Sequence, residues 1–156
     1  MGLKEVKEFF GQHNKADDII IVDDSSATVS LAAQALGVEE ERIAKSLTFQ
    51  GKEKPFMIVM AGDAKIDNRK YKDMFKTKAK MLTAEEVEDI TGHEVGGICP
   101  FAIKDTEMKV FLDESLKRFT TVFPACGSAQ SAIELTIDEL EKYGNCYEWI
   151  DVTKLQ

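Results

Sequence analysis

The chain has 156 residues, 44% of them hydrophobic, which is typical of a single globular domain, so we predict one domain over residues 1–156. Its net charge of −8 disfavours nucleic-acid binding through the field of the whole protein, because such binding requires lysine and arginine to neutralise phosphates. No apolar run approaches the roughly 20 residues that span a bilayer, and the first residues lack an apolar secretory stretch, so we expect a soluble cytoplasmic protein without a membrane partner.

In chain order, apolar residues at helical spacing predict a first helix over residues 3–10. A short β-branched run at 19–22 predicts a strand, and the polar residues 23–26 that follow predict a turn and a helix cap. A second apolar stripe predicts a helix over 29–36 that Gly37 ends.

Two paired strands are predicted next. Residues 44–49 alternate in polarity and residues 55–60 are continuously apolar, so the second strand is expected to be central in its sheet. Residues 50–54 form a hairpin-like connection between them.

The segment from Asp63 to Lys80 is basic, although the whole chain is acidic. It carries seven lysine or arginine residues against three aspartates, a net charge of +4. A helix is predicted over residues 69–75 within it. Such a run is either a solvated face or a local contact surface for RNA, and the charge pattern alone leaves both interpretations open.

Two further helices are predicted from capping boxes, in which a threonine and a glutamate three residues later satisfy each other's backbone amides. These are Thr83 with Glu86 before a stop at Gly92, and Thr136 with Glu139 before a stop at Gly144. Strands are predicted at residues 108–112, 120–123, 131–135 and 146–152. Strands and helices do not alternate regularly, so the fold class is α+β with a mixed, curved sheet.

Lys45 is the first candidate functional residue. In a strand over 44–49 it shares a face with Leu47 and Phe49, the face that a core would occupy. A lysine is seldom buried without a partner, because its charge is costly to desolvate. Lys45 therefore either reaches water from the strand end or places a cation at the edge of a cleft.

The loop Gly96-Gly97-Ile98-Cys99-Pro100 is the second candidate. Adjacent glycines allow positive φ angles and let backbone N–H groups approach a carbonyl or phosphate oxygen, although glycine and proline also form ordinary turns. His93 and Cys99 could pair as base and thiol nucleophile, but a cysteine is more often a buried apolar residue. The small residues from Cys126 to Ala132 either leave space beside a ligand pocket or simply form a tight turn.

Three cysteines without a Cys-x-x-Cys pair argue against a disulfide framework and against a zinc site. We expect a reducing compartment, no metal and no cofactor. No phosphate-binding P-loop or Rossmann fingerprint is present in the sequence.

Four segments, taken together and in order, resemble the YbaK family of aminoacyl-tRNA deacylases, which is related to the editing domain of bacterial prolyl-tRNA synthetase. The segments are Arg42 to Leu47, Met57 to Asp63, Gly96 to Phe101 and Gly127 to Leu135. The resemblance covers nearly the whole chain. It implies a curved mixed sheet of six or seven strands flanked by helices, and hydrolysis of the ester of a mischarged tRNA, with cysteine or alanine on proline tRNA as the expected substrates and prolyl-tRNA synthetase as a candidate partner.

The resemblance also assigns roles to residues. The family's strand lysine, which is thought to contact the substrate's 3′ end, maps onto Lys45, and its Gly-x-x-x-Pro loop maps onto Gly96, Gly97, Ile98, Cys99 and Pro100. The small-residue turn maps onto Gly127 and Ser128, and we add Ser46 and Ala129 as substrate-binding residues. From the basic segment, Lys70, Lys72 and Lys76 are candidate tRNA contacts.

Two alternatives remain at this stage. The chain could be a catalytically silent module of the same fold that binds tRNA or a synthetase. It could also be a thiol hydrolase that uses Cys99.

Overall fold

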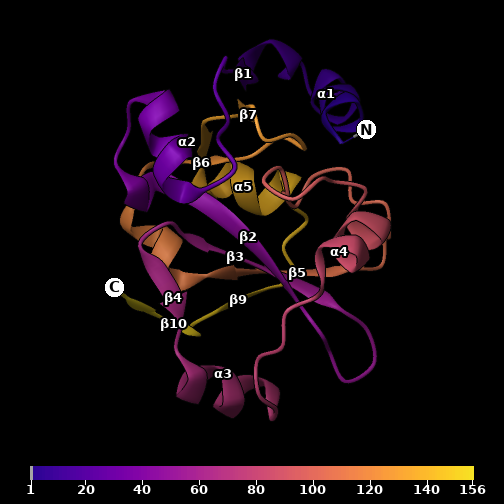
Figure 1. Ribbon diagram of the computed structural model, residues 1–156, viewed down its shortest axis with the longest axis vertical. Helices are drawn as coiled ribbons and strands as arrows, with labels where there is room; N and C mark the ends of the chain where they lie inside the picture. Colours follow the sequence, from indigo (N-terminus) through magenta and orange to yellow (C-terminus); the bar gives the residue numbers. More distant parts are fainter. Residues whose placement is uncertain (1) are drawn as a thin grey trace.

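A strongly curled, six-stranded mixed β-sheet forms the centre of the protein in the computed structural model, which describes residues 2–156 (Figure 1). Its strand order is β8-β6-β2-β3-β5-β9. The strands are β2 (Ile43–Phe49), β3 (Phe56–Ala61), β5 (Lys109–Asp113), β6 (Thr121–Pro124), β8 (Leu135–Thr136) and β9 (Glu148–Ile150). Antiparallel pairing joins β2 to β3 and β6 to β8, whereas β2–β6, β3–β5 and β5–β9 are parallel. This confirms the predicted α+β class with a mixed, curved sheet.

Two small antiparallel pairs form separate two-stranded sheets. They are β1 (Ile20–Ile21) with β7 (Ser131–Ala132), and β4 (Ala64–Ile66) with β10 (Thr153–Leu155). The helices are α1 (Leu3–Gly11), α2 (Val29–Leu36), α3 (Asn68–Phe75), α4 (Ala84–Thr91) and α5 (Ile137–Tyr143). None of the helices within residues 2–156 is long and apolar enough to cross a membrane.

The predicted helices are all present, and both capping boxes form as expected before α4 and α5. One cap was wrongly predicted. The N-cap of α2 is Thr28, whose side chain accepts a hydrogen bond from Leu31 N at 3.1 Å, and not a residue of the 23–26 turn. Threonine suits this position because its hydroxyl accepts from an amide that has no partner inside the helix.

Two predicted strands are each divided in the structure. Residues 131–135 change partners, since Ala132 pairs with Ile20 whereas Leu135 pairs with Val122. Residues 146–152 include β9 but end in a turn, after which the chain enters β10. The strand β4, which pairs with β10, was not predicted, because three residues are too few to show a two-residue alternation.

The core lies on both sides of β3, all six residues of which are buried, as its predicted central position requires. Tyr71 of α3 packs against the rings of Phe49 and Phe56 at centroid distances of 5.4 and 6.4 Å. Through its two buried alanines, α2 packs instead on a smaller cluster with Ile43 and Phe123. The start of β2 therefore lies beneath α2.

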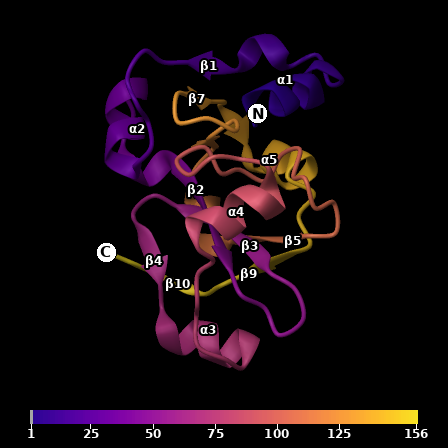
Figure 2. The same cartoon turned by 45° about the vertical axis from the view of Figure 1, so that its right-hand side comes forward.

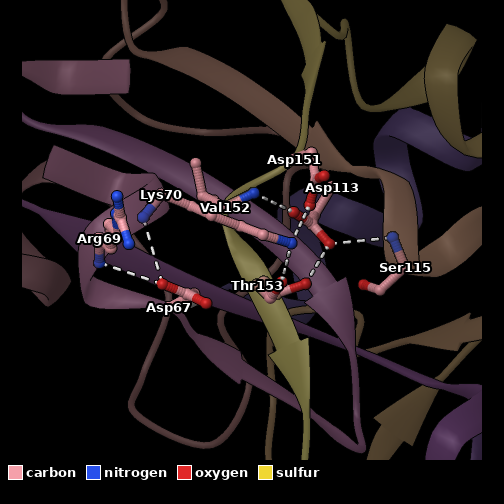
Figure 3. Close-up of polar contacts among 8 residues, drawn as sticks. All are labelled: Asp67, Arg69, Lys70, Asp113, Ser115, Asp151, Val152 and Thr153. Atoms are coloured by element: carbon pink, nitrogen blue, oxygen red, sulfur yellow. Dashed lines mark hydrogen bonds and ion pairs between the residues drawn. The ribbon is translucent and has the colours of Figure 1, made fainter. Parts of the chain in front are cut away.

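A buried carboxyl group joins the C-terminal part of the chain to the sheet (Figure 3). The Asp113 side chain is fully buried and accepts hydrogen bonds from Ser115 N at 2.9 Å, Val152 N at 3.0 Å and Thr153 Oγ1 at 2.7 Å. These bonds fix the turn between β9 and β10. They also fix the start of η3, the 3-10 helix Glu114–Arg118 that follows β5.

Candidate functional site

A cavity of about 390 Å³ lies along β2, between α2 and the segment that includes α4 and the following loop. Its walls are mostly apolar, with Val29 and Ala32 from α2 and Phe123 from β6. Two of the substrate-site residues predicted on β2, Lys45 and Ser46, line it, and so do Gly96 and Ile98 of the glycine loop. Among the described lining residues, Lys45 alone carries a charged side chain.

Lys45 is half-buried in the cavity wall. Its Nζ donates a hydrogen bond to the carbonyl oxygen of Gly62, in the turn after β3, at 3.3 Å. Burial lowers the pKa of Lys45 below that of an ordinary lysine, and the carboxylate of Asp63 opposes this effect. A lysine in this environment can bind an anionic or polarised oxygen, because it has few protein partners and little water around it.

Ser46 is a second polar group at the cavity. The residue is 8% exposed and lines the cavity, and its Oγ has no hydrogen-bond partner within residues 2–156. A buried hydroxyl without a partner is costly. The Oγ is itself buried, and the two-residue period of β2 places it on the face opposite Lys45, so a ligand can reach it only after neighbouring side chains move.

The glycine loop divides its residues between the cavity and the protein interior. Gly96 adopts φ +95°, and its amide and that of Ile98 donate to no other backbone group in the described chain. The Gly97 amide is occupied, since it donates to the Glu94 carbonyl at 2.9 Å. Two residues that line the cavity thus carry N–H groups without a hydrogen-bond partner in the described chain.

Gly97 packs against the turn at Gly127 and Ser128. Its carbonyl accepts from Gly127 N at 3.0 Å, and a Cβ added at Gly97 would collide with the Ser128 backbone, so only glycine fits here. The structure thus brings together the loop and the turn that the sequence analysis assigned to one site. Gly127, Ser128 and Ala129 pack against the glycines of the loop, and neither they nor Pro100 line the cavity.

Two residues of this support were not predicted. Glu94 Oε1 accepts from Ala129 N at 3.0 Å, and Ser26 Oγ donates to the Ala129 carbonyl at 2.6 Å. Both are polar residues in loops, where the sequence carries no periodic signal. Only their long-range contacts identify them.

Cys99 and His93 lie together in the core. Cys99 is fully buried and His93 is 1% exposed, with 3.6 Å between Cys99 Sγ and His93 Nε2. Burial raises the pKa of the Cys99 thiol to about 12, so the thiol is neutral near pH 7, and burial also lowers the pKa of His93. The Cys99 side chain does not line the cavity, which argues against a thiol nucleophile at this position.

For the ester hydrolysis that the sequence predicts, we expect Cys99→Ala to stay within about threefold of wild type, because the thiol is neutral and does not line the cavity. Mass spectrometry after iodoacetamide treatment of the native protein should find Cys99 unmodified, with the half-buried Cys146 as the internal comparison. A folded Cys99→Ala protein without activity would instead support the thiol mechanism.

The candidate tRNA contacts lie away from the cavity, on α3, which is at the opposite end of the molecule from α2 in both views (Figures 1 and 2). Lys70 is engaged within the protein: its Nζ donates to Asp151 Oδ1 at 3.0 Å and to the Thr153 carbonyl at 2.9 Å (Figure 3). Lys72 and Lys76 are exposed. In the part of the chain that the structure describes, no three histidine, cysteine, aspartate or glutamate residues converge to hold a metal ion.

Comparison with known proteins identifies relatives of this chain. A family model described as the aminoacyl-tRNA editing domain matches residues 23–143. The uncharacterized protein YwhH of Bacillus subtilis is 52% identical over 155 residues, 99% of this chain and 98% of YwhH. A proline–tRNA ligase of Halalkalibacterium halodurans is 33% identical over 113 residues, 71% of this chain, but the match spans only 19% of that enzyme.

The fold has close structural neighbours as well. The crystal structure of a protein described as a candidate trans-editing enzyme for prolyl tRNA synthetase superposes with a TM-score of 0.86 and 25% identity, covering 98% of this chain and 97% of its own.

Proposed function

Because the chain belongs to the aminoacyl-tRNA editing domain family, we propose that it is a trans-acting deacylase that hydrolyses the ester of a mischarged tRNA. The observation that carries this proposal is that one cavity is lined by Lys45, a cation, and by Gly96 and Ile98, whose backbone amides have no hydrogen-bond partner in the described chain. Family membership agrees with the resemblance of the four sequence segments to YbaK-type deacylases. It also makes cysteine or alanine on proline tRNA the first substrates to examine.

The proposed chemistry needs no metal and no protein nucleophile. Water adds to the ester carbonyl carbon and loses a proton, and the carbonyl oxygen becomes an oxyanion. The bond to the terminal ribose then breaks, and the ribose oxygen takes up a proton, so that the products are the free amino acid and the tRNA with its hydroxyl restored. An aminoacyl ester is already reactive, so positioning and oxyanion stabilisation supply most of the required acceleration.

Four polar groups of the cavity have a place in this reaction. The amides of Gly96 and Ile98 donate to the developing oxyanion, for which a single well-placed donor typically contributes about 10²- to 10³-fold in rate. The Lys45 ammonium binds an oxygen at the substrate's 3′ end, and the Ser46 hydroxyl hydrogen-bonds the aminoacyl group. The apolar walls exclude water that does not react.

The experiment that tests this function is a deacylation panel with purified protein. Cysteine, alanine and serine esters on several tRNAs, proline tRNA included, are followed against buffer alone, and correctly charged prolyl-tRNA serves as the matched substrate that should survive. We expect at least one mischarged tRNA to be hydrolysed faster than in buffer. If none is, but tRNA still binds, the silent binding module is the better description.

For tRNA binding we propose Lys72 and Lys76, which are exposed on the basic segment, and we set aside Lys70 because it is engaged within the protein. The double variant Lys72→Glu, Lys76→Glu is expected to raise KM for mischarged tRNA about tenfold at low salt, with kcat unchanged and the difference shrinking as salt is added. Lys4→Glu with Lys7→Glu on the exposed face of α1 is the matched control. Equal KM values for both double variants would remove α3 from the tRNA contact.

A further inference from the structure

The turn at Gly62 and Asp63, between β3 and β4, holds Lys45 from outside the cavity. The Gly62 carbonyl accepts the Lys45 hydrogen bond at 3.3 Å. A Cβ added at Gly62 would collide with the Glu40 carbonyl, so the turn lies directly on the chain that leads into β2. The position of the Gly62 carbonyl is therefore fixed by tight packing.

Asp63, the next residue, is held by a bidentate ion pair. Arg118 Nη1 and Nη2 donate to Asp63 Oδ2 and Oδ1 at 3.0 and 2.6 Å. Arg118 is itself anchored, since its Nε donates to the Ser115 carbonyl at 2.9 Å. Two parallel bonds between planar groups fix orientation as well as distance, so the carboxylate of Asp63 keeps one place.

The support for this turn extends into the buried centre of the protein. Ser115 Oγ accepts a hydrogen bond from Ala61 N at 3.1 Å, and Ser115 N donates to Asp113. One short helix, η3, thus holds the end of β3 through Ser115 and the Asp63 carboxylate through Arg118. The geometry of Lys45 depends on η3 although no residue of η3 lines the cavity.

The charges around Lys45 are few. Asp63 is the one charged group that raises the pKa of Lys45, against the burial that lowers it. Arg118 lowers the pKa of Asp63 and so keeps its carboxyl group ionised, while Glu41 and Asp113 act on Arg118. No ion pair joins Asp63 to Lys45 among the described residues, so the carboxylate acts on the ammonium through space, from the turn whose Gly62 carbonyl accepts the Lys45 hydrogen bond.

Resting on the proposed function, we propose that Asp63 is a positioning residue: its carboxylate, fixed by Arg118 in the same turn as the Gly62 carbonyl that accepts from Lys45, stabilises the Lys45 ammonium at the cavity wall. Asp63 does not line the cavity. Its contribution therefore acts entirely through Lys45.

The test is the titration of Lys45 in the full-length protein, observed by NMR of ¹⁵N- and ¹³C-labelled lysine, with the signal assigned by its absence in Lys45→Met. In Asp63→Asn, which keeps the shape of the side chain but removes its charge, we expect the Lys45 midpoint to fall by about 0.5 to 1 pH unit. The enzymatic deacylation rate, corrected for hydrolysis in buffer, should also decline at high pH with a midpoint that lies lower in Asp63→Asn by the same number of pH units. Glu107→Gln, which removes an exposed carboxylate paired with Lys54, should move neither.

The coupling can also be measured in the opposite direction. Because interacting groups shift each other's pKa equally, Lys45→Met should raise the Asp63 midpoint by the amount that Asp63→Asn lowers that of Lys45. This measurement decides the inference if Asp63→Asn does not fold. An unchanged Lys45 midpoint in folded Asp63→Asn, or an unchanged Asp63 midpoint in Lys45→Met, overturns it.

Both titrations are performed without substrate. An inactive deacylation panel would therefore remove the proposed function and leave the coupling between Asp63 and Lys45 measured. Conversely, an active enzyme in which Asp63 and Lys45 do not shift each other's titration midpoints would support the proposed function and contradict the role of Asp63.

Discussion

Replacing Lys45 with alanine is expected to lower kcat/KM for deacylation by about 100-fold or more, comparable with the loss of one oxyanion donor. Lys45 supplies the only charged side chain among the described residues of the cavity wall, so no neighbour can replace it. The fold should tolerate the change, because the side chain makes one hydrogen bond, to the Gly62 carbonyl, and lies at a cavity and not within the packed core. The measurement is deacylation of the best panel substrate, with thermal unfolding recorded in parallel.

The pH dependence of wild type adds a second signature. Since the pKa of Lys45 is lowered in the folded protein, the ammonium is fully present below that pKa and is lost as the pH rises through it, at a lower pH than for an exposed lysine. Enzymatic deacylation should fall over the same interval. Lys52→Ala, at an exposed lysine of the connection between β2 and β3, is the matched control and should behave as wild type. A Lys45→Ala protein with near wild-type kcat/KM would exclude Lys45 from the reaction.

Among the substitutions considered, Asp113→Asn is expected to lower the free energy of unfolding most, by about 3 kcal/mol. Both carboxyl oxygens accept hydrogen bonds from buried donors, Oδ1 from Val152 N and Oδ2 from Ser115 N and Thr153 Oγ1 (Figure 3). An asparagine retains one oxygen, and its NH₂ group must then face a donor. For a domain of this size the loss corresponds to a fall in Tm of roughly 6 to 12 °C.

The neighbouring Asp151 offers a matched control for this prediction. Asp151 is exposed and pairs with Lys70 at 3.0 Å, so Asp151→Asn should cost less than about 1 kcal/mol. Urea unfolding of both variants, with equal m-values, provides the comparison. Similar free energies of unfolding for the two variants would show that the Asp113 network contributes little.

Local sequence patterns predicted the helices because the interactions that start and stop a helix are local. Thr83 with Glu86 and Gly92 define α4 within ten residues of sequence, and the structure follows them. The pairs β1–β7 and β4–β10 were not predicted as pairs, since each joins segments far apart in the chain whose strands are only two or three residues long. Their pairing depends on tertiary contacts that no short window contains.

In the candidate site, too, local motifs were predicted from the sequence and tertiary contacts were not. The motifs identified Lys45 and the glycine loop, and both reach one cavity. They could not show which loop residues face it: Gly96 and Ile98 do, whereas Cys99 points into the core, and an irregular loop has no period from which its facing side could be read. The ion pair between Asp63 and Arg118, separated by 55 positions, had no sequence signal at all.

The parallel pairing of β2 with β6 has a consequence for synthesis of the protein on the ribosome. Ile43 pairs with Phe123, and the cavity walls draw on residues as late as Ala132, so a nascent chain that has completed β2 and β3 still lacks one side of the site. Until β6 emerges, the outer edge of β2 presents backbone amides and carbonyls without partners, a state that favours aggregation and engagement by chaperones. The complete cavity therefore forms late in synthesis, and truncated products of interrupted translation would carry Lys45 without the cavity around it.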